Sequence, residues 1–236
     1  MLTNQFKINY SVGSIANGVK TDTFTFFLLF FYSNIIGLNP GLAGTAIFIA
    51  LCVDAFTDPL MGTISDRTNT TFGRRHPYMF ISFIPMSLGY IFLFAPRQDW
   101  DMSQSDLFVW MTIFTILTRI GMTLFDIPHR AFGGEITKNY NERTLLMSWR
   151  EMFAWVAGLS NAFLGYGVFF ASTPEFPQGQ LNPDAWFPFA LTGALIMIIS
   201  VLYSSLSTKN EINSLSKWSG SIALGAILNE LKIALG

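Results

Sequence analysis

Charged side chains are scarce in this sequence. Only 12% of its 236 residues are Asp, Glu, Lys or Arg, whereas soluble domains average about 25%. The formal net charge is −1, so the chain lacks the strongly basic balance that is typical of nucleic-acid-binding proteins. Cysteine occurs once, at Cys52, which excludes a disulfide framework and a cysteine-based zinc site. These absences leave few soluble or secreted protein classes to consider.

Long apolar runs dominate the sequence instead. Hydrophobic residues make up 51% of it, and 24 residues are phenylalanine. A membrane-spanning helix needs about 20 mostly apolar residues, and six stretches meet that requirement: 11–37, 41–63, 77–96, 106–130, 143–172 and 185–207. The pattern predicts an all-α, multi-pass membrane protein with a bundle of six transmembrane helices over residues 1–207. The last segment, 208–236, is polar and then amphipathic, and it is predicted to be a cytoplasmic linker along the membrane surface.

Basic residues between the spans predict the orientation. With the amino terminus inside, ten Lys and Arg side chains fall in cytoplasmic segments and only Arg97 falls outside. Short cytoplasmic loops of membrane proteins carry this excess of positive charge. Both termini are therefore predicted to be cytoplasmic, in a protein of the cell (inner) membrane.

A few charged residues lie inside the apolar spans, where each costs at least about 2.5–3.5 kcal/mol on insertion scales. Asp54 and Asp58 are four residues apart in the second span and share one helix face. Paired buried carboxylates can bind Na⁺ through several oxygens, or share a proton because both do not easily ionise. The charges in the spans could also be structural ion pairs that hold the bundle together.

The depth of these charges favours a binding site over structural pairing. At 1.5 Å per residue, Asp22 and Asp54 lie about 15 Å, and Asp58 and Arg150 about 10 Å, from the cytoplasmic helix ends. Asp126 lies somewhat shallower. Four helices thus place ionisable groups in one band, and transporters bind solutes and coupling ions near the membrane midplane.

The loop between the second and third spans has a specific pattern of glycine and charge. Its members are Gly62, Asp66, Arg67, Gly73, Arg74 and Arg75. Gly62 permits close helix approach, Asp66 can cap the helix or pair with the arginines, and Gly73 sets a tight turn. The pattern is expected to latch the cytoplasmic side of the bundle.

This loop resembles the cytoplasmic motif of the major facilitator superfamily. More narrowly, the sequence resembles the glycoside–pentoside–hexuronide:cation symporters, the family of melibiose permease. The resemblance rests on Asp54-Ala-Phe-Thr-Asp58-Pro59-Leu-Met-Gly62, on Asp126-Ile-Pro128, and on Glu142-Arg143 followed by Arg150. It implies a cation site for Na⁺ or H⁺ at Asp54 and Asp58, the only metal ligands expected. It also implies a sugar site that includes Asp126 and Arg150, and it implies no cofactor.

Two positions depart from the family pattern. The sugar-binding aspartate of the first helix falls on Gly18 here, and Asp22, one turn further on, is a candidate replacement. A stacking tryptophan after the fourth-helix aspartate is replaced by Arg130. Arg130 is interpreted as a cytoplasmic anchor, or as a group that favours an anionic solute such as a hexuronide.

The resemblance implies that the chain corresponds to the amino-terminal half of a twelve-helix transporter. Its partners are then a sugar or glycoside, the lipid bilayer, and either a missing carboxy-terminal half or a second copy. Cation-coupled transport by alternating access is the favoured function. A symporter of lysolipids or other amphiphiles and a non-transporting membrane scaffold remain alternatives. No nucleophile–base pair or paired-histidine metal motif supports an enzyme.

Overall fold

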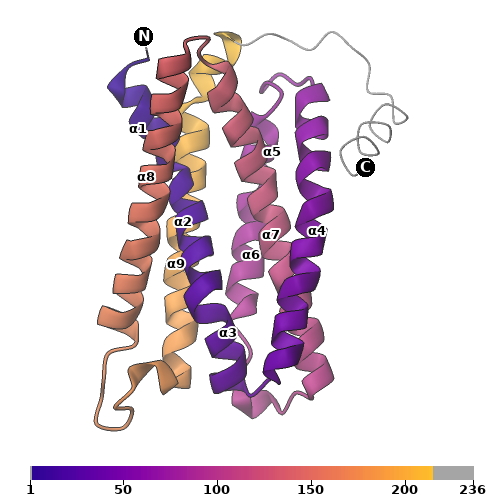
Figure 1. Cartoon of the computed structure of the whole chain (residues 1–236), viewed down its shortest axis with the longest axis vertical. Coiled ribbons are helices and arrows are strands. Elements are labelled where there is room, and N and C mark those ends of the chain that lie inside the picture. The colour runs from indigo at the N-terminus through magenta and orange to yellow at the C-terminus, as the bar shows by residue number, and fades with distance from the viewer. Residues whose placement is uncertain (1, 215–236) are drawn as a thin grey trace.

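The computed structural model describes residues 2–214, and within them the chain folds as a bundle of long, roughly parallel helical rods (Figure 1). The α-helices are α1 (Asn4–Val12), α2 (Ser14–Asp22), α3 (Leu28–Phe30), α4 (Pro40–Arg67), α5 (His76–Ile81), α6 (Phe83–Leu93), α7 (Gln104–Glu135), α8 (Tyr140–Leu164) and α9 (Trp186–Ser207). The described part contains no strand. Most of the predicted linker, from residue 215 onward, lies outside the described residues.

Five helical segments of the described chain are long and apolar enough to cross a membrane. They are Pro40–Arg67, His76–Leu93, Gln104–Glu135, Tyr140–Phe169 and Pro183–Glu211. They correspond to the second to sixth predicted spans, with boundaries that differ by a few residues. The fold class predicted from the sequence is therefore confirmed.

The first predicted span differs from an unbroken helix. It runs through α1, α2 and α3 as one rod along the bundle (Figure 1), but wider π-type turns interrupt it at Thr23–Phe27 and Phe31–Ile36. Polar side chains bond to backbone carbonyls beside these turns: Thr25 Oγ1 donates to Thr21 O at 2.8 Å, and Asn34 Nδ2 to Phe30 O at 3.3 Å. Such turns occur often at functional sites, and the first one follows Asp22 directly.

Capping residues fix where two of the long helices begin. Gly37 has a positive φ of 84° and ends the first rod, and Asn39 caps α4 by accepting a hydrogen bond from Gly41 N at 2.8 Å. Ser103 begins α7 with a capping box closed by Asp106. Gly37 and Asn39 thus make a short link between the first rod and α4.

The two ends of the described chain lie at the same end of the bundle (Figure 1). Leu2 N donates to Glu142 Oε1 at 3.1 Å, and Tyr203 Oη donates to Asn9 Oδ1 at 2.9 Å, so the start of the chain is held between α8 and α9. An even number of membrane passes requires this arrangement. The side of the membrane that this end faces remains a prediction from the basic residues.

Aromatic side chains fill the core at the opposite end. Trp186 is fully buried, and its ring stacks on Phe94 with centroids 6.2 Å apart. Phe27 and Phe31 from the first rod contact the same indole at 6.1 and 5.1 Å. By contrast, α4 and α8 bury only 17% of the residues in their most apolar windows. These two helices therefore have large apolar surfaces that contact nothing else in the described part of the chain.

Candidate functional site

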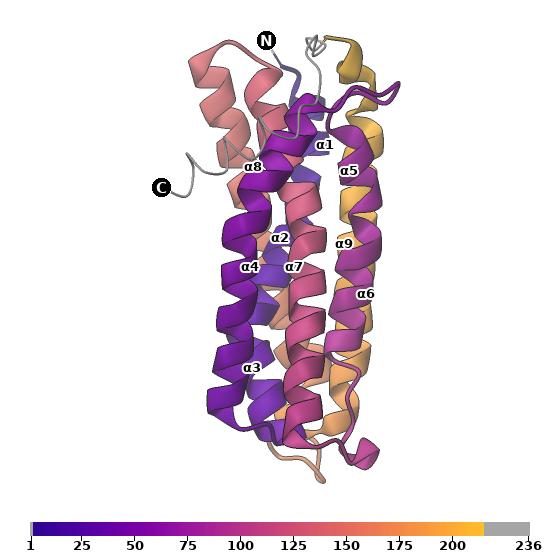
Figure 2. The ribbon, with the colours of Figure 1, turned by 90° about the vertical axis from the view of Figure 1, so that its right-hand side faces the viewer.

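Helices α4 and α7 run side by side in the same direction (Figure 2). A ladder of polar contacts joins them. Asp54 accepts a hydrogen bond from Arg119, and Asp58 accepts one from Thr123 Oγ1 at 2.7 Å, both with a sequence offset of 65 residues. One turn further on, a Cβ placed on Gly62 would lie 3.8 Å from a methyl group of Ile127. Both predicted cation-site carboxylates therefore face α7.

The two carboxylates of this ladder have different partners. Asp54 forms an ion pair with Arg119, and both side chains are largely buried. Asp58 has only the Thr123 hydroxyl as a hydrogen-bond partner among the described residues. Arg119 and Thr123 were not assigned to the site from the sequence. An arginine inside a membrane span requires a partner. That requirement is the sequence feature that could have indicated a role for Arg119 in the site.

No group of three His, Cys, Asp or Glu side chains within residues 2–214 could hold a metal ion. A Na⁺ ion at Asp54 and Asp58 would therefore need additional oxygens from hydroxyl or carbonyl groups. The Thr123 hydroxyl, already at Asp58, is one such group.

A second charged cluster joins α7 to α8. Arg150 is 1% exposed and forms ion pairs with both Asp126 and Glu151. Asp126 also forms an ion pair with Arg130 Nε at 2.7 Å, so its carboxylate lies between two guanidinium groups. The structure thus brings together Asp126 and Arg150, as expected. It also shows that Arg130, 52% exposed, reaches back one turn to the same carboxylate.

Asp22 belongs to a third cluster, between α2 and α8. Asn161 Nδ2 donates to Asp22 Oδ2 at 2.8 Å and to Thr23 Oγ1 at 3.1 Å. Thr23 shares a further hydrogen bond of 2.6 Å with Tyr90 Oη. These hydrogen bonds fix the Asp22 carboxylate although no arginine or lysine pairs with it among the described residues.

A groove of about 330 Å³ opens beside this carboxylate. Its wall combines polar groups with aromatic surface, and its lining residues are Asn17, Gly18, Thr21, Asp22, Thr25, Phe26, Glu151, Ala154, Trp155, Gly158 and Leu159. Carboxylate, hydroxyl and amide groups next to an aromatic ring can hydrogen-bond a polyol and cover its apolar face. The groove also connects to the second cluster through Glu151, which pairs with Arg150.

Gly18 is a close-packing position as well as part of this wall. A Cβ at Gly18 would lie 2.0 Å from the backbone oxygen of Ala154, a distance that requires α2 and α8 to separate. The position predicted to correspond to a family aspartate therefore cannot carry any side chain in this packing, which leaves Asp22 as the carboxylate on this face.

Gly18→Ala is expected to destabilise the bundle by about 3 kcal/mol, the upper part of the usual overpacking range. The physical reason is the backbone contact with Ala154, because a backbone carbonyl cannot rotate away as a flexible side chain can. Thermal unfolding of the purified protein in detergent measures the effect. Gly44→Ala is the matched control, since a Cβ there meets nothing within 4 Å. Equal unfolding temperatures for Gly18→Ala and Gly44→Ala would contradict the assignment of Gly18 as a close-packing position.

A fourth cluster joins α4, the following loop and the end of α7. Arg75 forms ion pairs with Asp66 Oδ1 at 2.6 Å and Glu135 Oε1 at 2.8 Å, and Arg74 pairs with Glu135 Oε2 at 2.7 Å. The glycine and arginine pattern of this loop was recognised in the sequence, whereas the part of Glu135 was not. Gly73 has a positive φ of 79°, which confirms the predicted tight turn. Arg67 is the last residue of α4.

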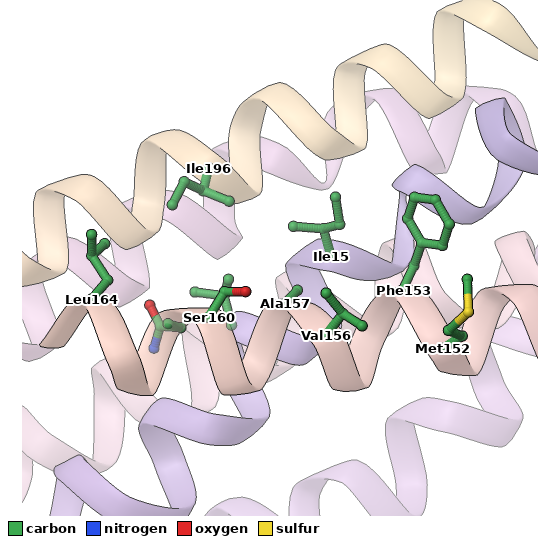
Figure 3. A pocket seen from close by; sticks show the side chains of 10 residues that line it. Ile15, Met152, Phe153, Val156, Ala157, Ser160, Leu164 and Ile196 are labelled. Atoms are coloured by element: carbon green, nitrogen blue, oxygen red, sulfur yellow. The ribbon is translucent and has the colours of Figure 1, made fainter. Parts of the chain in front are cut away.

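A separate, largely apolar groove of about 560 Å³ lies between α2, α8 and α9 (Figure 3). Ser160 and Asn161 are the polar residues among its described lining, and the apolar ones are Ile15, Val19, Met152, Phe153, Val156, Ala157, Leu164 and Ile196. This groove offers almost no hydrogen-bonding groups for a sugar. Its surface suits a hydrocarbon chain.

The sequence matches the profile of a known family, described as MFS/sugar transport protein, over residues 9–222. The chain belongs to this family. It is 32% identical to the uncharacterized symporter sll1374 of Synechocystis sp. over 211 residues, 87% of this chain. It is 33% identical over 159 residues, 67% of the chain, to the putative glycoside/cation symporter YagG of Escherichia coli. A third relative is the sodium-dependent lysophosphatidylcholine symporter 1-A of Danio rerio, 30% identical over 179 residues, 73% of the chain.

The chain spans only about a third of the length of these relatives. The matched segments cover 37%, 34% and 32% of the three proteins, respectively. The family match and the described helices establish family membership and the multi-pass helical fold. The activity and solute of a complete transporter are matters for proposal.

Proposed function

We propose that this chain provides the cation site and part of the solute site of a symporter for sugars or glycosides in the cytoplasmic membrane. The observation that carries the proposal is the α4–α7 ladder, in which Asp58 lies at bilayer depth with no basic partner within the described chain. Such an intramembrane carboxylate is costly unless it binds a cation or a proton. The neighbouring Asp54 supplies a second carboxylate on the same helix face.

The proposed solute site lies on the α2–α8 side of the same bundle. Asp22, Trp155 and Glu151 line its groove, and the Arg150–Asp126 pair adjoins it through Glu151. Solute hydroxyls can accept hydrogen bonds from arginine and donate to the carboxylates. Trp155 is 72% exposed, so it is a candidate for the stacking aromatic residue that the family carries at the position of Arg130.

Transport requires a second set of helices to close the pathway. The uncovered surfaces of α4 and α8 support this requirement, and we infer that a second six-helix half or a second copy packs there. The two halves then rock about the shared site, and the Asp66–Arg75–Glu135 cluster holds the cytoplasmic ends of α4 and α7 together in one of the two states. The cation and the solute each favour the same state, so each strengthens binding of the other.

An amphiphile with one acyl chain is the second candidate solute. The apolar groove between α2, α8 and α9 favours it, and so does the name of the Danio rerio relative. Both candidates share the proposed cation site and differ in the groove that holds the solute.

The test is solute uptake into membrane vesicles that contain the protein expressed from its complete gene. Radiolabelled methyl galactoside, methyl xyloside, methyl glucuronide and lysophosphatidylcholine are supplied with an inward Na⁺ gradient, an inward H⁺ gradient or no gradient. Gradient-driven accumulation of at least one glycoside is expected. Accumulation of the lysolipid alone would favour the second candidate, and no accumulation of any probe would contradict symport.

A further inference from the structure

We propose that Arg119 is a tethered competitor of the coupling cation and thereby sets the affinity of the cation site. This inference rests on the proposed cation site at Asp54 and Asp58. Arg119 comes from α7, and its guanidinium donates to Asp54 on α4. A guanidinium is a monovalent cation that stays charged at all physiological pH values. It therefore occupies at Asp54 the electrostatic position that a Na⁺ ion or a proton would take.

The surroundings of Arg119 show that the pair is a built feature of the bundle. The side chain is only 13% exposed, and its guanidinium carbon lies 5.5 Å from the centroid of the Phe24 ring on the first rod. Lys20, one turn before Phe24, has its ammonium nitrogen 5.9 Å from the same ring. A second basic group, from α2, thus lies against the same ring as the Arg119 guanidinium.

The pair leaves hydrogen-bonding capacity unused. Asp54 Oδ1 and Arg119 Nε are both buried without a hydrogen-bond partner within the described part of the chain. A contact through one nitrogen uses fewer N–H donors of the guanidinium than the two parallel hydrogen bonds that Arg and a carboxylate can make. The Arg119–Asp54 contact is therefore an exchangeable one, which a cation at Asp54 can replace.

Because Arg119 and the cation exchange at Asp54, the apparent cation affinity depends on how often Arg119 has moved away. Only molecules in which Arg119 has moved away present both carboxylates, so the apparent dissociation constant equals the intrinsic constant divided by the fraction of such molecules. Asp58 with Thr123 stays available throughout, because Arg119 does not contact it. Removal of the Arg119 charge should raise that fraction toward one and tighten cation binding.

The experiment measures equilibrium Na⁺ binding to the purified protein from its complete gene, by titration calorimetry at pH 8 and without solute. Arg119→Gln is expected to bind Na⁺ at least tenfold more tightly than the wild type. Arg119→Lys keeps the charge and should stay within about threefold of the wild type. The double variant Asp58→Asn/Arg119→Gln should lose the gain, which shows that the added affinity arises at the carboxylate pair.

Equal or weaker Na⁺ binding by Arg119→Gln would overturn the proposal, because a purely structural arginine would give that result. If Arg119→Gln does not yield folded protein, the double variant Asp54→Asn/Arg119→Gln is measured in its place and compared with Asp54→Asn. That variant should show the same weak Na⁺ binding as Asp54→Asn, and tighter binding than Asp54→Asn would contradict competition at Asp54. The readout uses no solute, so failure of glycoside uptake and failure of this proposal are separate results.

Discussion

Replacement of Asp58 by Asn is expected to reduce gradient-driven solute accumulation by at least about 100-fold, to the level seen without a gradient. The amide keeps the shape of the carboxylate and can still accept the hydrogen bond from Thr123, which is 2.7 Å long in the native protein. What it loses is the negative charge, and with it the ability to bind Na⁺ or a proton at this depth. Uptake into vesicles under an imposed Na⁺ or H⁺ gradient measures the effect.

Asp99→Asn is the matched control for this experiment. Asp99 is a carboxylate on the surface, 71% exposed and 3.5 Å from Arg97, so its removal should leave uptake unchanged. Exchange of solute without a gradient should survive in Asp58→Asn, because the solute groove does not include residue 58. Gradient-driven accumulation that persists in Asp58→Asn would remove this residue from the cation site.

Replacement of Arg150 by Ala is expected to weaken solute binding at least tenfold while changing cation affinity less than about threefold. Arg150 is buried, and it holds both Asp126 and Glu151, the second of which lines the solute groove. Loss of one partner from a buried pair typically costs about 3–5 kcal/mol. The remaining Arg130–Asp126 pair at 2.7 Å should reduce that cost. Solute and Na⁺ titrations on the same folded preparation separate the two affinities.

Arg150→Lys provides the control for charge alone. Lysine can neutralise one carboxylate but cannot present the planar fork that lets Arg150 bond to Asp126 and Glu151 together. An intermediate solute affinity is therefore expected. If Arg150→Ala weakens cation binding more than solute binding, the arginine belongs to the cation site or acts only through the fold.

The sequence predicted most of the fold because its signals are local. Apolar length defined the spans, and each span is recognised from its own residues alone. The spacing of Asp54 and Asp58 placed both on one helix face without knowledge of the neighbouring helix. The turn at Gly73 followed from the same kind of local reasoning.

Contacts between helices were not predictable in the same way. Arg119 and Thr123 face Asp54 and Asp58 because α4 and α7 pack with an offset of 65 residues, and no periodicity within one helix fixes such an offset. The close approach that makes Gly18 necessary depends on where α2 crosses α8. Likewise, the loop motif offered capping or pairing with the arginines as roles for Asp66, but it could not indicate that Glu135 would join Arg74 and Arg75.

His129 illustrates the limit of residue type as a signal. Its ring is fully buried between Tyr10 and Phe125, with centroid distances of 4.0 and 4.7 Å. Its Nε2 lies 3.0 Å from Tyr10 O. The histidine therefore joins α1 to α7 in the bundle core. The residue type and its position near the end of a span do not indicate this burial.

The central claim is that the α4–α7 carboxylates bind a cation whose presence strengthens solute binding. The most direct test titrates the glycoside that gives uptake into the purified protein from its complete gene, at fixed pH, with and without 100 mM Na⁺, and at low and high pH without Na⁺. Either Na⁺ or H⁺ is expected to tighten solute binding about fivefold or more, within the usual range of coupling between sites. The effect is also expected to disappear in Asp58→Asn. Solute affinity that is independent of both Na⁺ and pH would contradict the account.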